Sequence, residues 1–208
     1  MKRIPLIIII PALLSLTSCM TIVQSIFGWK DPKPISESVM NRYAKHFNIP
    51  PAANFSLDSS YLHYLFSLDT SLFKHQAKNH YQPLQALYFN KQGGLTKFYI
   101  NCYAGGFPTI KWNRNGKLDI FPPGDRAPVD TLLNLDRQLS FLNVTKESVN
   151  PDLKSPDYVV FIYWNTFMKR HSRHLIHSIR KNCALSDPNK VKIIYVNNDN
   201  FCSCFYKN

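Results

Sequence analysis

The sequence has few acidic residues and few glycines. It contains 13 Asp and Glu against 25 Lys and Arg, which gives a formal net charge of +12, and only 7 glycines among 208 residues. It contains no glycine-rich phosphate loop, no H-E-x-x-H and no G-x-S-x-G. The usual signals of a nucleotide-binding loop, a zinc protease and a serine hydrolase are therefore missing. The sequence leaves enzymatic activity open, and a non-enzymatic role is the better expectation.

The apolar run at the start of the chain is short. It extends from Ile4 to Leu16, is interrupted by two prolines and follows Lys2 and Arg3. A helix that crosses a bilayer core of roughly 30 Å needs about 20 apolar residues. A charged start, a short apolar region and small residues before a cut are typical of a secretory signal. Residues 1–18 are therefore predicted to be a signal peptide and not an anchor helix.

The four residues Leu16-Thr17-Ser18-Cys19 directly follow the apolar run. They resemble the lipobox of bacterial lipoproteins. This resemblance implies that the chain is cut before Cys19 and that this cysteine carries the lipid at the mature N-terminus. Two or more acyl chains anchor a protein stably, whereas one binds only marginally. We therefore expect a cell-envelope protein, lipid-anchored at the periplasmic face of the outer membrane; an ordinary signal followed by an incidental cysteine is the alternative.

The excess of basic residues limits which negatively charged partners are expected. Removal of residues 1–18 lowers the formal charge from +12 to +10, because Lys2 and Arg3 are lost and no acid is. An exported lipoprotein meets little nucleic acid, so no nucleic-acid partner is expected. Anionic lipid head groups attract Lys and Arg by about 1 kcal/mol per residue near the surface. A general excess that only keeps the protein soluble is the alternative. The sequence identifies neither a cofactor nor a protein partner.

The rest of the chain is predicted to be a tether, residues 19–34, and a single α/β domain, residues 35–208. The tether has no sustained apolar period, and its Ile26, Phe27 and Trp29 are expected at the membrane surface. In residues 35–47 apolar side chains recur at steps of four, which predicts a helix that ends before the prolines of "IPPA".

Two further helices are predicted in the N-terminal third. One follows Ser56 or Asp58, either of which can cap it, and the other extends from Ser71 to Asn79. The sequence explains no function for these helices.

The middle of the chain changes to an alternating, aromatic-rich pattern. The segments "LQALYFN" and "LTKFYINCY" flank "KQGG", which predicts a β-hairpin. The segments "PTIKWN" and "KLDIFPP" flank "RNG" and predict a second hairpin. Helical spacing in "APVDTLLNLDRQLSFL" then predicts a helix near residues 129–142.

The last third predicts a strand, a helix and a strand. "YVVFIYW", from Tyr158, is nearly continuously apolar, as is typical of a strand covered on both faces. A helix from about Met168 to Cys183 and the strand "VKIIYV" follow. A unit of this length joins two parallel strands with a right-handed crossover. The expected fold class is α/β with a mixed sheet, in which N-terminal helices and β-hairpins precede this βαβ unit.

Residues 158–198 resemble the first βαβ unit of the thioredoxin fold. Against the W-C-x-x-C pattern of that family, Phe167 matches the tryptophan, Met168 the first cysteine and His171 the second. The resemblance therefore implies a thioredoxin-like domain that has lost its redox cysteines, with a binding or scaffold role in place of dithiol catalysis.

The second half of an ordinary thioredoxin is a strand pair introduced by a cis proline, followed by a helix. Residues 105–139 resemble that half. We hypothesise that the two halves are present in exchanged order, with Pro108 facing the turn at Met168. An unrelated mixed sheet is the alternative.

Four cysteines besides Cys19 remain, namely Cys102, Cys183, Cys202 and Cys204. A strand rises about 3.3 Å per residue, so Cys202 and Cys204 are expected some 20 Å or more from Cys183, beyond the roughly 7 Å limit of a disulfide. Pairing of Cys102 with either of them stays open. A residual thiol oxidoreductase that uses Cys202 and Cys204 would need an exposed thiol of low pKa.

The same geometry suggests a metal site. Cys202 and Cys204 are expected near the carboxyl ends of the parallel strands, with Met168 and His171, where open α/β sheets commonly bind ligands. These soft ligands suit monovalent copper or, less well, zinc. The alternative is a packed Met168, a solvated His171 and a purely structural pair of cysteines.

The predicted helix after Met168 is rich in basic residues. His171, His174 and His177 recur every three residues, but each step rotates about 60° away from the last, so they do not converge on one ion. We expect them to join a basic exposed face that is either solvated or in contact with anionic lipid. The other residues of this predicted face are Lys169, Arg170, Arg173, Arg180 and Lys181.

Overall fold

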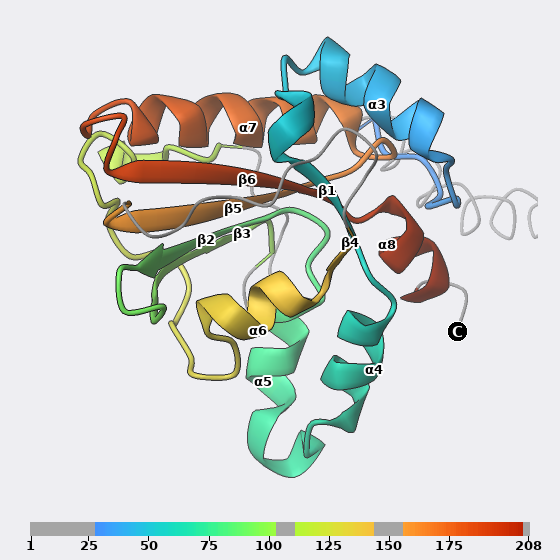
Figure 1. Ribbon diagram of the computed structural model, residues 1–208. Helices are drawn as coiled ribbons and strands as arrows, with labels where there is room; N and C mark the ends of the chain where they lie inside the picture. Colours follow the sequence, from blue (N-terminus) through green and yellow to red (C-terminus); the bar gives the residue numbers. More distant parts are fainter. Residues whose placement is uncertain (1–27, 103–110, 144–155, 206–208) are drawn as a thin grey trace, which may run out of the picture.

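The computed structural model describes residues 28–102, 111–143 and 156–205. It has three layers, in which a six-stranded sheet separates two groups of helices (Figure 1). The upper layer consists of α3 (Glu37–His46) and α7 (Lys169–Cys183). The lower layer consists of α4 (Ser60–Ser67), α5 (Thr70–His80) and α6 (Leu135–Ser140). The predicted mixed α/β fold class is confirmed.

The sheet has the strand order β3-β2-β5-β6-β1-β4. The strands β5 (Tyr158–Trp164), β6 (Val191–Asn197) and β1 (Asn54–Leu57) are mutually parallel. The other three strands run antiparallel to their neighbours; they are β2 (Gln85–Asn90), β3 (Leu95–Ile100) and β4 (Leu142–Asn143). The predicted parallel unit β5-α7-β6 and the predicted hairpin β2–β3 are therefore both present.

The apolar patterns that predicted the central unit also explain its packing. Phe161, Ile162 and Tyr163 are fully buried, because α7 covers one face of β5 and the lower layer covers the other. The inward face of α7 is apolar and buried at Leu175 and Ile179. Burial of each such side chain contributes about 1.5–3 kcal/mol, so this unit forms the centre of the core.

The prediction of a second hairpin is wrong. The described part of that segment, residues 111–123, lies outside the sheet and contains only a short 3₁₀ turn, Arg114–Gly116. The buried side chain of Asn182 on α7 donates to the carbonyl oxygens of Leu118 at 2.9 Å and Ile120 at 2.6 Å. These bonds hold the segment against the end of α7. The hypothesis that residues 108–121 supply sheet strands is therefore wrong for 111–121, and Pro108 lies outside the described residues.

The helices of the N-terminal third agree with the sequence. The helix α3 lies within the predicted residues 35–47, and Asp58 accepts the backbone N–H of Ser60 at 2.8 Å at the start of α4. The predicted helix near residues 129–142 is shorter than expected. The observed helix, α6, begins only at Leu135, because Asn134 caps it by accepting the backbone N–H of Arg137 at 2.9 Å.

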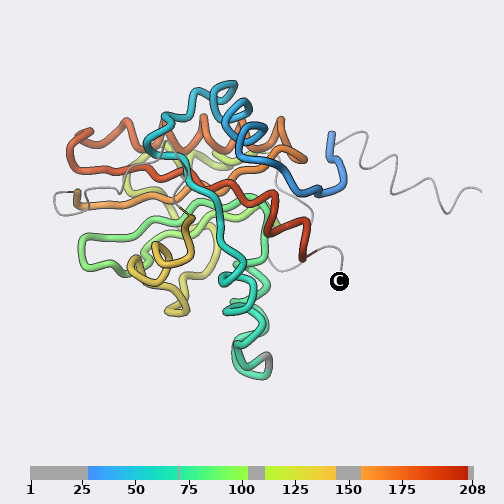
Figure 2. The backbone as a smooth tube through the Cα atoms, turned by 45° about the vertical axis from the view of Figure 1, so that its right-hand side comes forward, coloured from blue at the N-terminus to red at the C-terminus, as the bar shows by residue number. Residues whose placement is uncertain are grey.

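Among the described strands and α-helices, three were not predicted, namely β1, β4 and the helix α8 (Asp199–Phe205). Figure 2 shows α8 leaving the end of β6 on the side of the sheet where β5 meets α7. The same view shows α4 and α5 projecting away from the sheet on the side opposite α7.

Candidate functional site

The carboxyl ends of the parallel strands meet at the turn between β5 and α7. Asn165, fully buried in this turn, donates through Nδ2 to the carbonyl oxygen of Pro83 at 3.0 Å and to Oδ1 of Asn198 at 3.3 Å. Its Oδ1 accepts the backbone N–H of Met168 at 2.9 Å. Asn198 also donates to the Pro83 carbonyl, at 2.9 Å. Two amides therefore join the ends of β5 and β6 to Pro83, two residues before β2.

A buried carboxylate completes this network. Asp199 accepts the Thr166 hydroxyl at 2.8 Å and the Asn197 side-chain amide at 2.7 Å. Burial raises the pKa of Asp199, and this outweighs the hydrogen bonds from Asn197 and Thr166, which lower it. These hydrogen bonds lock the turn in place, because the polar groups at the strand ends are bonded to one another.

Residues 29–35, which we call the strap, lie across this turn. The backbone N–H of Lys30 donates to the carbonyl oxygen of Phe167 at 3.0 Å, and that of Ile35 donates to Oδ1 of Asn200 at 2.8 Å. The ring of Trp29 stands edge-on to that of His171, with centroids 6.2 Å apart. The last part of the predicted tether therefore packs on the domain, whereas Ile26 and Phe27 lie outside the described residues.

The residues predicted as metal ligands lie near the strand ends, but not all on one surface. Met168 and His171 are both buried. The alternative to a metal site, which expected a packed Met168 and a solvated His171, is therefore right for Met168 and wrong for His171. Cys202 is fully buried and Cys204 is exposed, because residues two apart on α8 point about 200° away from each other. Within residues 28–102, 111–143 and 156–205, no three His, Cys, Asp or Glu side chains are grouped to hold a metal ion.

Burial suppresses the reactivity of two thiols. It raises the pKa of Cys183 to about 12, and it raises the pKa of Cys202 well above its ordinary value, with a smaller contribution from Asp199. The thiolate is the nucleophilic form. The thiol of Cys202 is therefore neither exposed nor of low pKa, although the oxidoreductase alternative requires a thiol with both properties.

The predicted basic face divides into two parts. Lys169, Arg170, Arg173 and Lys181 are exposed on α7. Arg180 is not part of that face, since its guanidinium donates to the Tyr195 hydroxyl at 2.7 Å and to the carbonyl oxygens of Phe47 at 3.1 Å and Asn48 at 2.6 Å. Arg180 joins α7 to β6 and to the end of α3, a role that its charge alone did not reveal.

A cavity of about 250 Å³ opens beside the strand ends. Polar side chains from five elements line it, together with Ile35 and Met40: Ser36, Glu37, Ser56, Asn143, Asn197 and Asn200. Ser56 and Asn143 could not be assigned to this cavity from the sequence, because β1 and β4 were not predicted.

No family model, no curated protein and no solved structure matches the chain. In the part of the chain that the structure describes, no helix is both long enough and apolar enough to cross a membrane.

Proposed function

We propose that this protein is a lipid-anchored envelope protein whose thioredoxin-like, redox-inactive domain has a binding or scaffold role at the periplasmic face of the membrane. The observation that carries the proposal is the state of the β5–α7 turn. Residues 165–171 contain no cysteine, and the amides of Asn165 and Asn198 lock the turn while the strap covers it. A dithiol enzyme needs an accessible thiolate at its reactive turn.

The arrangement of strands supports the thioredoxin-like part of the proposal. The hairpin β2–β3 lies antiparallel beside β5, and Pro83, two residues before β2, is in contact with Asn165 of the turn. In an exchanged order of halves, this hairpin would be the strand pair that residues 111–121 do not supply. It departs from the family in one respect, since the peptide bond before Pro83 is trans.

The anchor is tested by lipid labelling of the full chain. With labelled palmitate, the parent protein should incorporate label and fractionate with membranes in high salt, whereas Cys19→Ser should lose both properties, because high salt screens any attraction of the basic residues to the membrane. Cys204→Ser is the matched control, because it removes an exposed cysteine elsewhere and should keep both. Label retained by Cys19→Ser at the parent level would refute the anchor.

The domain's chemistry is tested separately. The parent protein should reduce a disulfide substrate no faster than the Cys202→Ser/Cys204→Ser double variant. A rate that depends on these cysteines would favour the oxidoreductase alternative instead. One copper ion retained in a native mass spectrum and lost in the same double variant would favour metal handling.

A further inference from the structure

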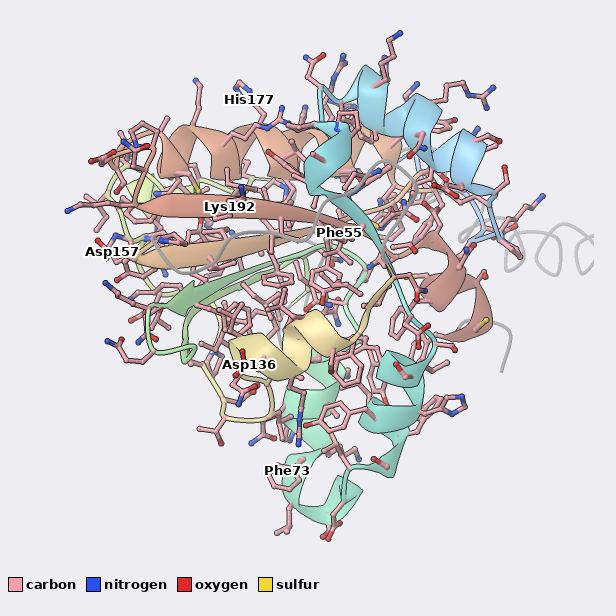
Figure 3. All side chains as sticks on the ribbon, viewed as in Figure 1. Phe55, Phe73, Asp136, Asp157, His177 and Lys192 are labelled. Atoms are coloured by element: carbon pink, nitrogen blue, oxygen red, sulfur yellow. The ribbon has the colours of Figure 1, made fainter. Side chains whose placement is uncertain are left out.

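The outer side of α7 carries positive charge at both ends of the helix, with three exposed basic residues in its first two turns and one near its last residue. The helix contains five Lys and Arg and no acid. Its exposed basic residues Lys169, Arg170, Arg173 and Lys181, which we call the basic face, lie within a single sector of about 120°, because each residue turns the helix by about 100°. Figure 3 shows that His177, between them, points away from the sheet.

Electrostatics within α7 reflect this concentration. The pKa of His174 is lowered, first by partial burial and then by the neighbouring charges of Arg170 and Arg173 and by His171 and His177. Positive groups therefore crowd this surface closely enough to oppose one another. A negatively charged layer that covered the surface would relieve this repulsion.

The helix α3 extends the same layer. Its exposed side chains include Arg42 and Lys45, and its first turn contains Glu37. The Nζ atom of Lys169 lies 5.4 Å from the ring centroid of Tyr43, which places the start of α7 beside α3. The strap adds Lys30 and Lys33, together with Asp31.

The chain length between Cys19 and the strap limits the distance to the membrane. Nine residues lie between Cys19 and Trp29, so ten residue-to-residue steps join them, and an extended chain spans at most about 3.6 Å per step, or roughly 36 Å. Trp29 and Lys30 are held at the first turn of α7, next to Lys169 and Arg170. A lipid at Cys19 therefore keeps the basic face within reach of the membrane surface.

We propose that the basic face of α7 binds the anionic phospholipid head groups of the membrane that holds Cys19, so that α7 lies along the bilayer surface. The helices α4 and α5, on the opposite side of the sheet, then point away from the membrane (Figure 2). This inference rests on the proposed anchor, which supplies the lipid surface. A lipid chain and a basic patch are the two signals that together give stable attachment.

Lysine acylation of the mature, lipidated protein in vesicles tests the orientation. In vesicles of phosphatidylglycerol and phosphatidylcholine, Lys169 and Lys181 should react about fivefold more slowly than in vesicles of phosphatidylcholine alone. Lys74 and Lys78, exposed on α5, should react equally in both. High salt should abolish the difference, because it screens the attraction.

Two other outcomes of the lysine acylation experiment would overturn the inference. Equal protection of Lys169 in neutral and anionic vesicles would show that head-group charge is not recognised. Protection of Lys74 and Lys78 in place of Lys169 and Lys181 would place the opposite side of the domain on the membrane.

A second measurement separates the face from the anchor. The full chain with Cys19→Ser should still bind anionic vesicles in a sedimentation assay, and Arg170→Glu/Arg173→Glu/Lys181→Glu should weaken this binding about a hundredfold. The matched control Lys74→Glu/Lys78→Glu/Lys91→Glu changes the net charge equally at exposed positions of the other layers and should weaken it only a few-fold. An equal loss in both variants would overturn the inference, even if palmitate labelling had confirmed the anchor.

Discussion

The carboxylate of Asp199 accepts the backbone N–H of Thr166 at 2.9 Å and the Thr166 hydroxyl at 2.8 Å. These two residues belong to different elements, since Thr166 lies in the turn after β5 and Asp199 begins α8 after β6. The bonds hold the turn at a fixed position relative to β6, and the strap is bonded to the next residue of the turn, Phe167. Asp199 therefore fixes the surface on which the strap lies.

Replacement of Asp199 should destabilise the domain by an amount that depends on pH. Asp199→Ala leaves the Thr166 N–H and the Asn197 amide without their acceptor, at about 1–3 kcal/mol for each buried donor. Burial raises the pKa of Asp199 in the folded state above its ordinary value of 3.8. At any pH between 3.8 and this raised pKa, the folded state therefore binds more protons than the unfolded state. The stability that the protonated group contributes is fully present below pH 3.8 and is lost as the pH rises through the raised pKa.

Urea unfolding at two pH values checks this. The difference in free energy of unfolding between the parent and Asp199→Ala should be larger at pH 4 than at pH 7. Asp136→Ala, at an exposed position on α6, corrects for the loss of one surface carboxylate (Figure 3). A difference that grows towards pH 7 would mean that the hydrogen bonds outweigh burial.

The cysteines should differ sharply in reactivity. Iodoacetamide should modify exposed Cys204 in the folded protein, whereas Cys183 and Cys202 should react only after unfolding, because both are buried and their pKa values are raised. Mass spectra of protein labelled before and after denaturation give the modified positions. Rapid labelling of Cys202 in the folded state would contradict the observed burial and reopen the thiol enzyme.

The sequence predicted the elements whose own residues determine them. The unit β5-α7-β6 was found because a β-branched run and a 3.6-residue period are local signals. The strand β1 has only four residues, follows two prolines and is held by pairing with β6, so no local signal shows it.

The locked turn could not be predicted for the same reason. Asn165 bonds to Pro83, 82 positions away, and to Asn198, 33 positions away. His171 was expected to be exposed or to bind a metal, but it is buried on a helix whose local pattern is polar, with Trp29 of the strap packed against it. Periodicity identifies the side of a helix that faces its own sheet, but it does not show which distant segment covers the other side.

The contact between Trp29 and His171 should be measurable as a coupling energy. In a double-mutant cycle of Trp29→Ala and His171→Ala, we expect a coupling of about 0.5–1.5 kcal/mol in urea unfolding, as for other edge-to-face ring pairs. A second cycle, Trp29→Ala with His177→Ala, is the control, because His177 is exposed farther along α7. Equal coupling in the two cycles would mean that the strap does not dock specifically on the turn.

Arg180 and Arg173 should have opposite effects although both lie on α7. Arg180→Ala removes hydrogen bonds to the Tyr195 hydroxyl and to two backbone carbonyls, so it should lower the free energy of unfolding by about 2 kcal/mol. Arg173→Ala, at an exposed position, should change it by less than about 0.5 kcal/mol.

Charge alone does not explain the expected loss at Arg180. Arg180→Lys keeps the charge but not the planar guanidinium that reaches three oxygens, so it should restore only a minor part of the lost stability. In vesicle sedimentation, a change at Arg173 should have a larger effect than a change at Arg180. Arg173→Glu should weaken binding to anionic vesicles about fivefold or more, whereas Arg180→Lys should leave it within twofold, because Arg180 is committed to Tyr195 and the end of α3. Full recovery of stability by Arg180→Lys would show that position 180 acts as a simple positive charge and would return it to the basic face.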